Sequence, residues 1–239
     1  RITGGEPLLN SNFWDLLEKL HKDPHPEMSL FINSNLSVEK KLIEKLVESL
    51  GSLRSKGAIQ NIRIITSQES VGEASHYIRT GLKANLFWEN LSYICKNEES
   101  VEVSITSTLQ ILSVGSFEEF LEFFFSFRKQ HKHCKLWFDP TALQYPDFLS
   151  IEFLAEPFRT TFKGQLTFLI DKYRLEMTAF EAERIQNIIS LLKMPLNEEE
   201  MPKKRLALKN YLIALDKVRG TNIYQSIPAM SLYFERAEE

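Results

Sequence analysis

Glycine and cysteine are both scarce in this chain, which has nine glycines and two cysteines among its 239 residues. So few glycines argue against a turn-rich all-β sandwich, because tight turns in such folds depend on glycine. The cysteines, Cys95 and Cys134, stand alone and far apart in the sequence. Isolated cysteines of this kind indicate a reducing, cytoplasmic setting rather than a framework of disulfide bonds.

An excess of one charge and long apolar runs are missing too. The formal net charge is −3, so the bulk charge does not indicate a nucleic-acid partner. No apolar run approaches the roughly 20 residues that span a bilayer, and we expect no membrane partner. Apolar residues still make up 43% of the chain, which is enough for a sizeable core in one large domain or two small ones.

Short apolar runs alternate with helical patterns through the first part of the chain. We predict strands over residues 28–33, 61–67, 101–107 and 134–140, and helices over 10–22, 37–51, 73–97 (broken near Gly81) and 116–130. A helix between successive strands predicts a mostly parallel sheet, and nearly continuous apolar strands fit a sheet buried on both faces. A doubly wound sheet and a TIM-like barrel both satisfy this pattern.

The alternation ends near the middle of the chain. Helical patterns then follow one another over residues 153–172, 178–193 and 200–217. We therefore predict a partial α/β barrel unit over residues 1–150 and a helical C-terminal extension over 151–239 that packs on it.

The segment GGEP (4–7) follows the short apolar start RIT, which reads as the end of a further strand. One interpretation is a tight turn, with Glu6 and Pro7 favourably placed at the start of a helix. The other is a ligand site, because parallel α/β folds bind ligands at the carboxyl ends of their strands. There the two glycines expose backbone groups, and the Glu6 carboxylate adds an acceptor for a cationic amine.

The segment RITGGEPLLN resembles the Gly-Gly-Glu motif that closes the second strand of radical S-adenosylmethionine (SAM) enzymes. LFINSNLS (30–37) is similar to the third strand of that family, which often ends in a Thr-Asn-Gly-like turn. IRIITSQESVGEASHYIRTGLKANLFWENL (62–91) resembles the fourth strand and its helix. VSITSTLQ (103–110) and LWFDP (136–140) resemble the fifth and sixth strands.

The C-terminal part adds to this resemblance. FLSIEFLAEPFR (148–159) and YLIALDKVRGTNIYQSIPAM (211–230) resemble radical SAM proteins with a shortened "twitch" auxiliary region. The resemblance implies an α/β fold, namely an incomplete parallel (β/α) barrel of radical SAM type with a mostly helical C-terminal extension.

The resemblance also implies roles for individual residues. It implies cofactor binding by Gly4, Gly5, Glu6, Ser67, Arg79 and Thr106, and substrate binding by Asn33, Asn35 and Asp139. Each has a structural alternative, such as strand-end capping for Ser67, a solvated helix position for Arg79 and turn formation for the asparagines. We assign no catalytic residue and no metal ligand.

One departure from the family limits what this chain does alone. Radical SAM enzymes hold a [4Fe–4S] cluster on a Cys-x-x-x-Cys-x-x-Cys loop after the first strand, and thiolates are needed to hold that iron. Residues 1–239 contain no such loop. We therefore expect a fragment of a radical SAM protein that lacks the cluster, with SAM and the cluster as cofactors of the intact parent. The expected reaction of that parent is reductive cleavage of SAM and hydrogen abstraction from an unknown substrate.

Two other functions stay open. The first is a non-catalytic α/β binding or scaffolding protein in which the Gly-Gly-Glu segment is only a turn. The second is an ordinary barrel enzyme such as a lyase or aldolase, which needs a lysine or metal cluster at the strand ends that the sequence does not supply. Unpaired strand edges of an incomplete barrel also invite association, so we expect a homodimer through the exposed edge or a C-terminal segment that covers it.

Two further segments have competing interpretations. HKHC (131–134) contains metal-ligand residue types, but its run from a helix into a strand makes its side chains diverge, which disfavours a metal site. The helix at 116–130 carries six phenylalanines: Phe117, Phe120, Phe123, Phe124, Phe125 and Phe127. We favour a role for them in the core over a partner interface.

Overall fold

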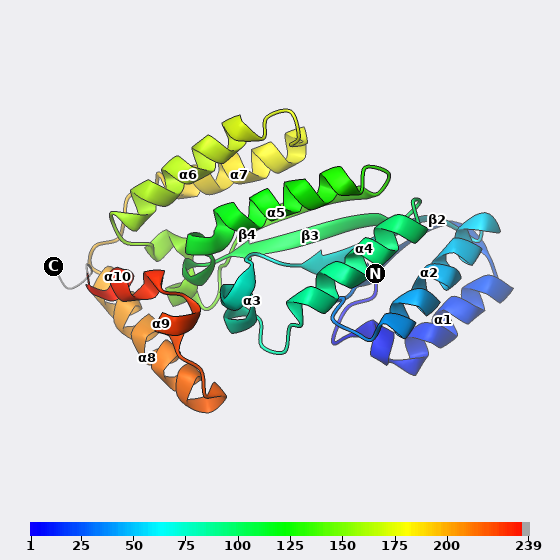
Figure 1. Ribbon diagram of the computed structural model, residues 1–239, viewed down its shortest axis with the longest axis horizontal. Helices are drawn as coiled ribbons and strands as arrows, with labels where there is room; N and C mark the ends of the chain where they lie inside the picture. Colours follow the sequence, from blue (N-terminus) through cyan, green and yellow to red (C-terminus); the bar gives the residue numbers. More distant parts are fainter. Residues whose placement is uncertain (236–239) are drawn as a thin grey trace. The chain divides into compact units, whose positions relative to one another are not determined.

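The computed structural model describes residues 1–235 (Figure 1). Its first part contains η1 (Pro7–Leu9), α1 (Ser11–Lys22), β1 (His25–Asn33), α2 (Lys40–Ser55), β2 (Ile59–Ser67), α3 (Gly72–Ile78), α4 (Ala84–Asn97), β3 (Glu102–Leu109), η2 (Ile111–Ser116), α5 (Phe117–Gln130) and β4 (Lys135–Ala142). Its second part contains η3 (Asp147–Leu149), η4 (Ile151–Phe153), α6 (Phe158–Lys172), α7 (Ala179–Leu191), α8 (Met201–Arg219), α9 (Ile223–Ser226) and α10 (Ala229–Glu235). Each η is a 3₁₀ helix.

The strands form one four-stranded sheet in the order β1-β2-β3-β4. β1 pairs with β2 in parallel, and β2 pairs with β3 in parallel. Ile2 adds a parallel bridge to Ile32 on the other side of β1, as expected if RIT is the end of a further strand. The predicted strands and their parallel arrangement are thus confirmed. The sheet is open, however, and the predicted barrel is not confirmed.

Contacts divide the chain into two compact units, which we describe separately. Unit 1 contains Arg1–Gln68, Gly81–Thr106 and Phe124–Phe138. Unit 2 contains Glu69–Thr80, Ser107–Phe123 and the described part of the chain from Asp139 onward.

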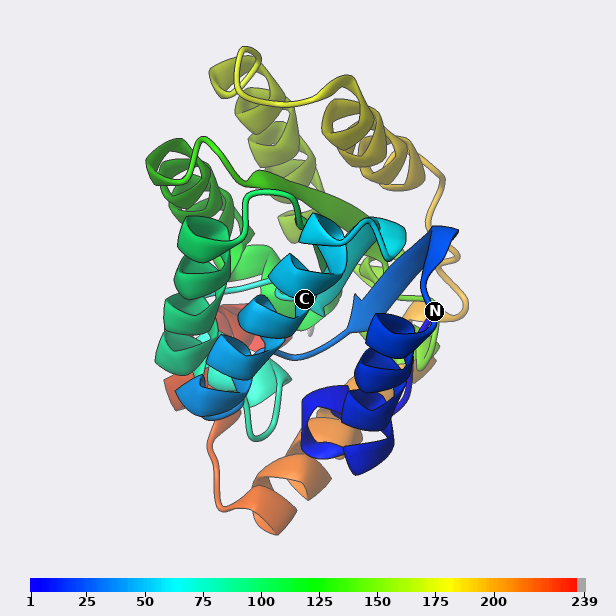
Figure 2. The same cartoon turned by 90° about the vertical axis from the view of Figure 1, so that its right-hand side faces the viewer.

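In unit 1, helices α1, α2 and α4 lie one beside the next (Figures 1 and 2). α1 begins after Asn10, whose side chain accepts a hydrogen bond from the backbone N–H of Asn12. α2 contributes the buried residues Ile43, Leu46 and Leu50 at helical spacing. The helix predicted over 73–97 is interrupted as expected, because Gly81 has a left-handed φ of 80° between α3 and α4.

The two faces of the sheet in unit 1 differ in burial. One face contains Leu30, Ile32, Ile62, Ile64, Val103 and Ile105, all at most 5% exposed. The other, which we call the open face, contains Phe31, Asn33, Arg63, Ile65, Ser67, Glu102, Ser104, Thr106 and Trp137. All of these except Ser104 are partly exposed. The expectation of a sheet buried on both faces is therefore wrong. Alternation with polar residues gives the sheet a partly solvated face, which is unusual for parallel strands.

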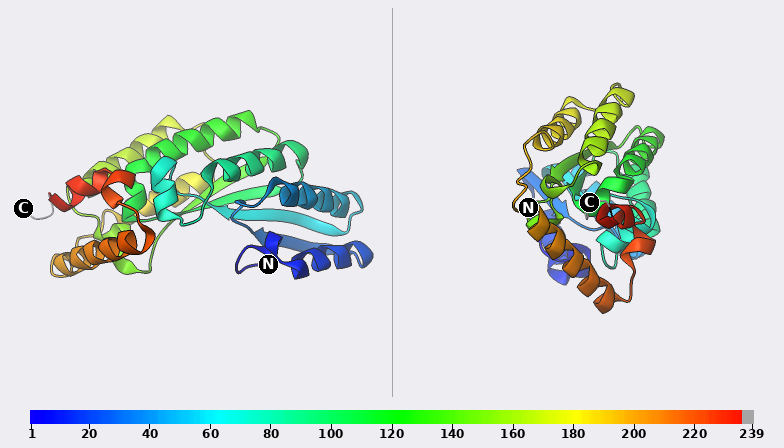
Figure 3. Two further views of the ribbon diagram at one scale, coloured as in Figure 1. Left: turned by 60° about the horizontal axis from the view of Figure 1, so that its bottom comes forward. Right: turned by 90° about the vertical axis from the view of Figure 1, so that its left-hand side faces the viewer.

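Unit 2 contains the helices predicted for the C-terminal part of the chain. α6 and α7 lie side by side (Figure 3, right). The buried Arg159 of α6 donates hydrogen bonds to the carbonyls of Leu191, Leu192 and Met194 and so satisfies acceptors at the end of α7. In the part of the chain that the structure describes, no helix is both long enough and apolar enough to cross a bilayer.

The phenylalanine-rich helix is mostly a core element, as predicted. In unit 2, Phe117 and Phe120 are fully buried, and the Phe117 ring contacts Phe162 of α6 edge to face. In unit 1, Phe124, Phe125 and Phe127 are buried as well. Phe123 is the exception, with 43% of its surface exposed.

Candidate functional site

The Gly-Gly segment forms a turn that only glycine adopts without strain. Gly4 and Gly5 have φ values of +94° and +59°, in the left-handed region. An added Cβ would meet no atom within 4 Å at either position, so backbone conformation rather than lack of space requires glycine here. Both glycines are exposed, which leaves their backbone groups accessible beside the end of β1.

Glu6 fastens this turn to the carboxyl end of β1. Its Oε1 accepts hydrogen bonds from the Ser34 hydroxyl at 2.8 Å and from the Leu8 N–H at 3.2 Å. Its Oε2 accepts a 2.8 Å hydrogen bond from the Asn35 N–H. Since an ionised carboxylate has about four acceptor positions, most of its capacity is used within the protein. Glu6 therefore shapes the site more than it offers a free acceptor.

The loop after β1 is held from its other side as well. Leu36 is fully buried and has a φ of +53°, a conformation that is strained for a residue with a branched side chain. The buried Asn90 of α4 donates to the carbonyls of Leu36 and Val38 at 2.8 and 2.9 Å. Asn35, one of the predicted substrate residues, accepts from the Ser37 N–H through Oδ1 and so stabilises the loop. Sequence reasoning missed Ser34, Leu36 and Asn90.

Polar side chains gather at the carboxyl end of the open face. The Oδ1 atom of Asn33 is buried and has no hydrogen-bond partner in the described structure. Ser67 on β2 pairs with Thr106 on β3. Ser67 lies two residues after Ile65, the partner of Asn33, and therefore on the same face of the sheet. Neither hydroxyl has a hydrogen-bond partner among the described residues. An acceptor and two hydroxyls on one face provide groups for a polar ligand.

A charged cluster lies further along the same face. Arg63 donates from Nε and Nη2 to Oε2 of Glu102 at 3.1 and 2.8 Å. Its guanidinium also lies over the rings of Phe31 and Trp137, with centroid distances of 5.5 and 4.8 Å. The sequence signal for this cluster is the alternation of Ile62, Arg63 and Ile64, which places Arg63 on the opposite face of the sheet from its neighbours.

Arg79, a predicted cofactor residue, lies in unit 2 and is paired with an acid. It donates from Nε and Nη2 to Oε2 of Glu69 at 2.8 and 2.6 Å. Glu69 is only 2% exposed, and this burial raises the pKa of its carboxyl despite the attraction of Arg79. The guanidinium is thus engaged by a buried carboxyl rather than solvated.

Asp139, a predicted substrate residue, also lies in unit 2. Its Oδ1 accepts a 2.6 Å hydrogen bond from Nε of Arg184 on α7, and this bond raises the pKa of Arg184. Arg184 lines a cavity of about 340 Å³, together with Thr141 and Glu152 among others. The cavity therefore contains charges of both signs.

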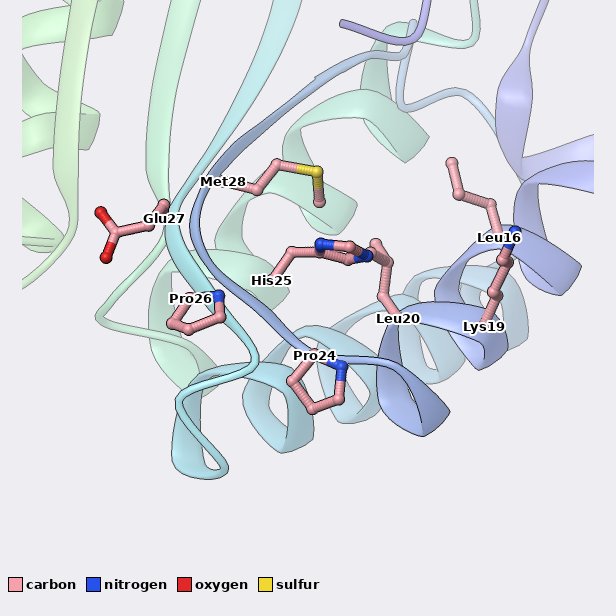
Figure 4. Close-up of a pocket in the computed structure, with 8 residues that line it drawn as sticks. All are labelled: Leu16, Lys19, Leu20, Pro24, His25, Pro26, Glu27 and Met28. Carbon is pink, nitrogen blue, oxygen red and sulfur yellow. The ribbon is translucent and has the colours of Figure 1, made fainter.

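A larger and mainly apolar groove lies in unit 1, at the amino half of β1 (Figure 4). It has a volume of about 570 Å³ and is lined by Leu16, Lys19, Leu20, Pro24, His25, Pro26, Glu27 and Met28. Figure 4 shows Met28 reaching into the groove and Glu27 pointing away from it. Because ligands of parallel α/β folds bind at the carboxyl ends of strands, this groove is not our candidate cofactor site.

The cysteines are not isolated in space, which corrects the expectation from the sequence. Cys95 and Cys134 are both buried, and their sulfur atoms lie 2.7 Å apart. The neighbouring His131 of the HKHC segment hydrogen-bonds to Ser92, with 3.2 Å between Nε2 and Oγ. No group of three or more candidate metal ligands occurs within residues 1–235.

No family model, curated protein or solved structure matches this chain. Its function is therefore inferred from its own residues.

Seven of the nine predicted site residues lie in unit 1, and two lie in unit 2. Six of the seven, Gly4, Gly5, Glu6, Asn33, Ser67 and Thr106, lie on the turn or on the carboxyl end of the open face; Asn35 lies in the adjoining loop. This end offers the buried acceptor of Asn33, two hydroxyls and exposed glycine backbone. Such groups suit a ligand with an ammonium group and hydroxyls, and they supply no thiolate for iron.

Proposed function

We propose that this chain is the SAM-binding part of a radical SAM enzyme. The observation that carries the proposal is the unpartnered Oδ1 of Asn33 at the carboxyl end of an open polar face, next to the Gly4-Gly5-Glu6 turn. An unpaired buried acceptor is unfavourable unless a ligand or water donates to it. The consecutive strand order β1-β2-β3-β4 also supports the proposal, since successive strands of a (β/α) barrel are neighbours.

The loop after β1 gives independent support. Radical SAM enzymes often have a Thr-Asn-Gly-like turn at this point, and this chain has Ser34, Asn35 and Leu36. Leu36 has a positive φ of 53°, which a glycine adopts freely. A positive φ at the position of the family's glycine supports the resemblance of this turn to theirs.

The residues of unit 1 have distinct roles in this proposal. The backbone of Gly4 and Gly5 and the Oδ1 of Asn33 accept hydrogen bonds from the SAM ammonium group. Ser67 and Thr106 bond to the ribose hydroxyls or the carboxylate of SAM. Glu6 is a positioning residue, because its three hydrogen bonds hold the glycine turn against Ser34 and Asn35. Arg79 has no role in this site, because the buried Glu69 engages it.

Bound SAM supplies, on one-electron reduction, a radical that abstracts hydrogen from a substrate. The described residues do not fit the [4Fe–4S] cluster that delivers this electron, because the two cysteines are buried against each other. The proposal requires a cluster loop outside residues 1–239, and we expect these residues alone to bind SAM without reacting. The substrate is unknown. We reassign Asn33 from the substrate to SAM, and Asn35 stays a candidate substrate contact. Asp139, in unit 2, is paired with Arg184.

A second candidate is a non-catalytic binding or scaffolding protein. It is favoured by the fact that Glu6, Arg79 and Asp139 are all engaged within the protein. In that case the Gly-Gly-Glu segment is a turn and Asn33 is hydrated. The two candidates differ in their response to ligand, since only the first predicts that SAM stabilises the protein against heat.

We also propose that the protein works in the cytoplasm and that it forms a homodimer. The dimer interface that we propose is the edge of β1 with its adjoining apolar groove. Within residues 1–235, the bridge from Ile2 to Ile32 covers this edge near the carboxyl end of β1. The groove lies near the amino end of the strand, where an unpaired edge favours association.

The coding DNA upstream of Arg1 tests the proposed enzyme. An in-frame Cys-x-x-x-Cys-x-x-Cys segment a few tens of residues before Gly4 is the expected result. Anaerobic reconstitution of that longer chain then yields the absorbance of an iron–sulfur cluster and SAM cleavage. Upstream sequence without such a segment, or a start codon immediately before Arg1, contradicts cluster-dependent chemistry.

A further inference from the structure

Cys95 and Cys134 come together from distant parts of the sequence. They are 39 positions apart, and their sulfur atoms are separated by 2.7 Å in unit 1. Cys95 lies near the end of α4, and Cys134 lies in the turn that enters β4. The exposed fractions of the two residues are 3% and 6%. The packing of α4 against this turn therefore places two thiols in direct contact.

A second side-chain contact holds the same two segments together. Ser92 hydrogen-bonds to His131, and each of these residues precedes its cysteine by three positions. Residues three apart on a helix lie on the same side, so Ser92 and Cys95 both face the turn. The ring of Phe127 contacts His131 at a centroid distance of 4.4 Å. The Ser92–His131 hydrogen bond and the Phe127–His131 ring contact hold α4 and the turn together and so help to position the two sulfur atoms.

The two thiols are not chemically equivalent. The Cys95 S–H donates to the Cys134 sulfur, and this hydrogen bond lowers the pKa of Cys134 although burial opposes the change. The same bond and burial raise the pKa of Cys95. The thiolate is the form that attacks a disulfide, so Cys134 is the first nucleophile of the pair.

We propose that Cys95 and Cys134 are a site of reversible oxidation to an intramolecular disulfide by low-molecular-weight disulfides. The Cys134 thiolate attacks one sulfur of the oxidant RSSR, forming a mixed disulfide and releasing RS⁻. Cys95 then loses its proton and attacks the Cys134 sulfur, which breaks the mixed disulfide and releases the second RS⁻. The protein loses two electrons and two protons, and the oxidant becomes two RSH.

The cross-link has a measurable consequence for folding. It closes a loop that contains β3, η2 and α5 and so restricts the unfolded chain. We expect the oxidised protein to have a higher thermal midpoint than the reduced protein, with reversal by dithiothreitol. This inference does not depend on SAM binding, so either proposal can fail without the other.

In the test, the folded chain is treated with excess oxidised glutathione. The remaining thiols are then alkylated with iodoacetamide under denaturing conditions. The expected wild-type product is a monomer that has lost two hydrogens and carries no alkyl group, with a cross-linked peptide containing Cys95 and Cys134. The Cys95→Ser variant is expected to accumulate the mixed disulfide on Cys134. The Cys134→Ser variant is expected to react much more slowly.

Two results overturn the proposal. One is a wild-type chain that keeps both cysteines alkylated after prolonged oxidation, while a denatured sample oxidises readily. The other is a product made only of intermolecular dimers. Circular dichroism of both variants establishes whether they fold, and the wild-type result stands without them.

Discussion

The hydroxyl of Ser34 donates a 2.8 Å hydrogen bond to the carboxylate of Glu6, 28 positions earlier in the sequence. This bond joins the Gly-Gly turn to the loop after β1, and the Asn35 N–H adds a second connection to the same carboxylate. The acid in the Gly-Gly-Glu segment thus acts on the protein itself. For a ligand at this end of the sheet, the role of Glu6 is to position the Gly-Gly turn and the loop after β1.

This finding predicts coupling between Glu6 and Ser34. Glu6→Gln replaces one acceptor oxygen by an amide group, so a backbone N–H or the Ser34 hydroxyl loses its partner. We expect each of Glu6→Gln and Ser34→Ala to lower the free energy of unfolding by about 1–2 kcal/mol. The double variant should lose less than the sum, as measured by urea denaturation. The exposed Glu18→Gln on α1 is the control, and strict additivity would contradict the coupling.

The strained conformation of Leu36 predicts an unusual order of stability. Leu36→Ala and Leu36→Gly both remove a fully buried side chain, and both should destabilise the protein. Alanine keeps the Cβ that disfavours the positive φ, whereas glycine relieves it. We therefore expect Leu36→Gly to be more stable than Leu36→Ala by about 1 kcal/mol in chemical denaturation. The usual order, with alanine more stable, would show that the strain is absent.

The buried Glu69 predicts a pH dependence of stability. Its pKa is raised from the ordinary value of 4.5, so the folded protein holds this proton more tightly than the unfolded chain does. The stability that this group contributes is therefore complete below about pH 4.5 and is lost as pH rises through the folded pKa. Relative to Glu69→Gln, the wild type should become less stable as the pH is raised above about 4.5, as measured by urea denaturation. A wild type that gains on the variant would mean that Arg79 outweighs burial.

The proposed edge of β1 predicts self-association. Sedimentation equilibrium should show a dimer, and Leu16→Lys should shift it to monomer because a charge then lies in the apolar groove. Leu9→Lys is the matched control, since Leu9 is 71% exposed and lies outside the groove. A monomeric wild type would contradict the proposed homodimer.

The strands and helices could be predicted because local patterns specify them. The apolar runs around Ile32, Ile64 and Ile105 predicted the strands, and the helical segments between successive strands predicted their parallel arrangement. The open face was missed because Phe31 and Ile65 made the strands look apolar on both sides. Only the register with Arg63 and Glu102 reveals a polar face.

The remaining features depend on contacts that sequence spacing does not encode. No local signal indicates that Leu36 has a positive φ or that Asn90 bonds to its carbonyl. The contact between Cys95 and Cys134 requires α4 to pack against the turn before β4. Arg79 and Asp139 were singled out by their places in the sequence, and only the folded chain gives them Glu69 and Arg184 as partners.

Calorimetric titration with SAM shows whether SAM binds at this end of the sheet. It compares the wild type, Asn33→Ala and, as a control, the exposed Asn12→Ala. Asn33→Ala removes a carbonyl oxygen that has no partner, so it should not lower the thermal midpoint. We predict saturable binding at one site per chain, unchanged in Asn12→Ala and weakened roughly tenfold in Asn33→Ala. Absence of binding to the wild type, or equal affinity in all three proteins, would contradict a SAM site at this end of the sheet.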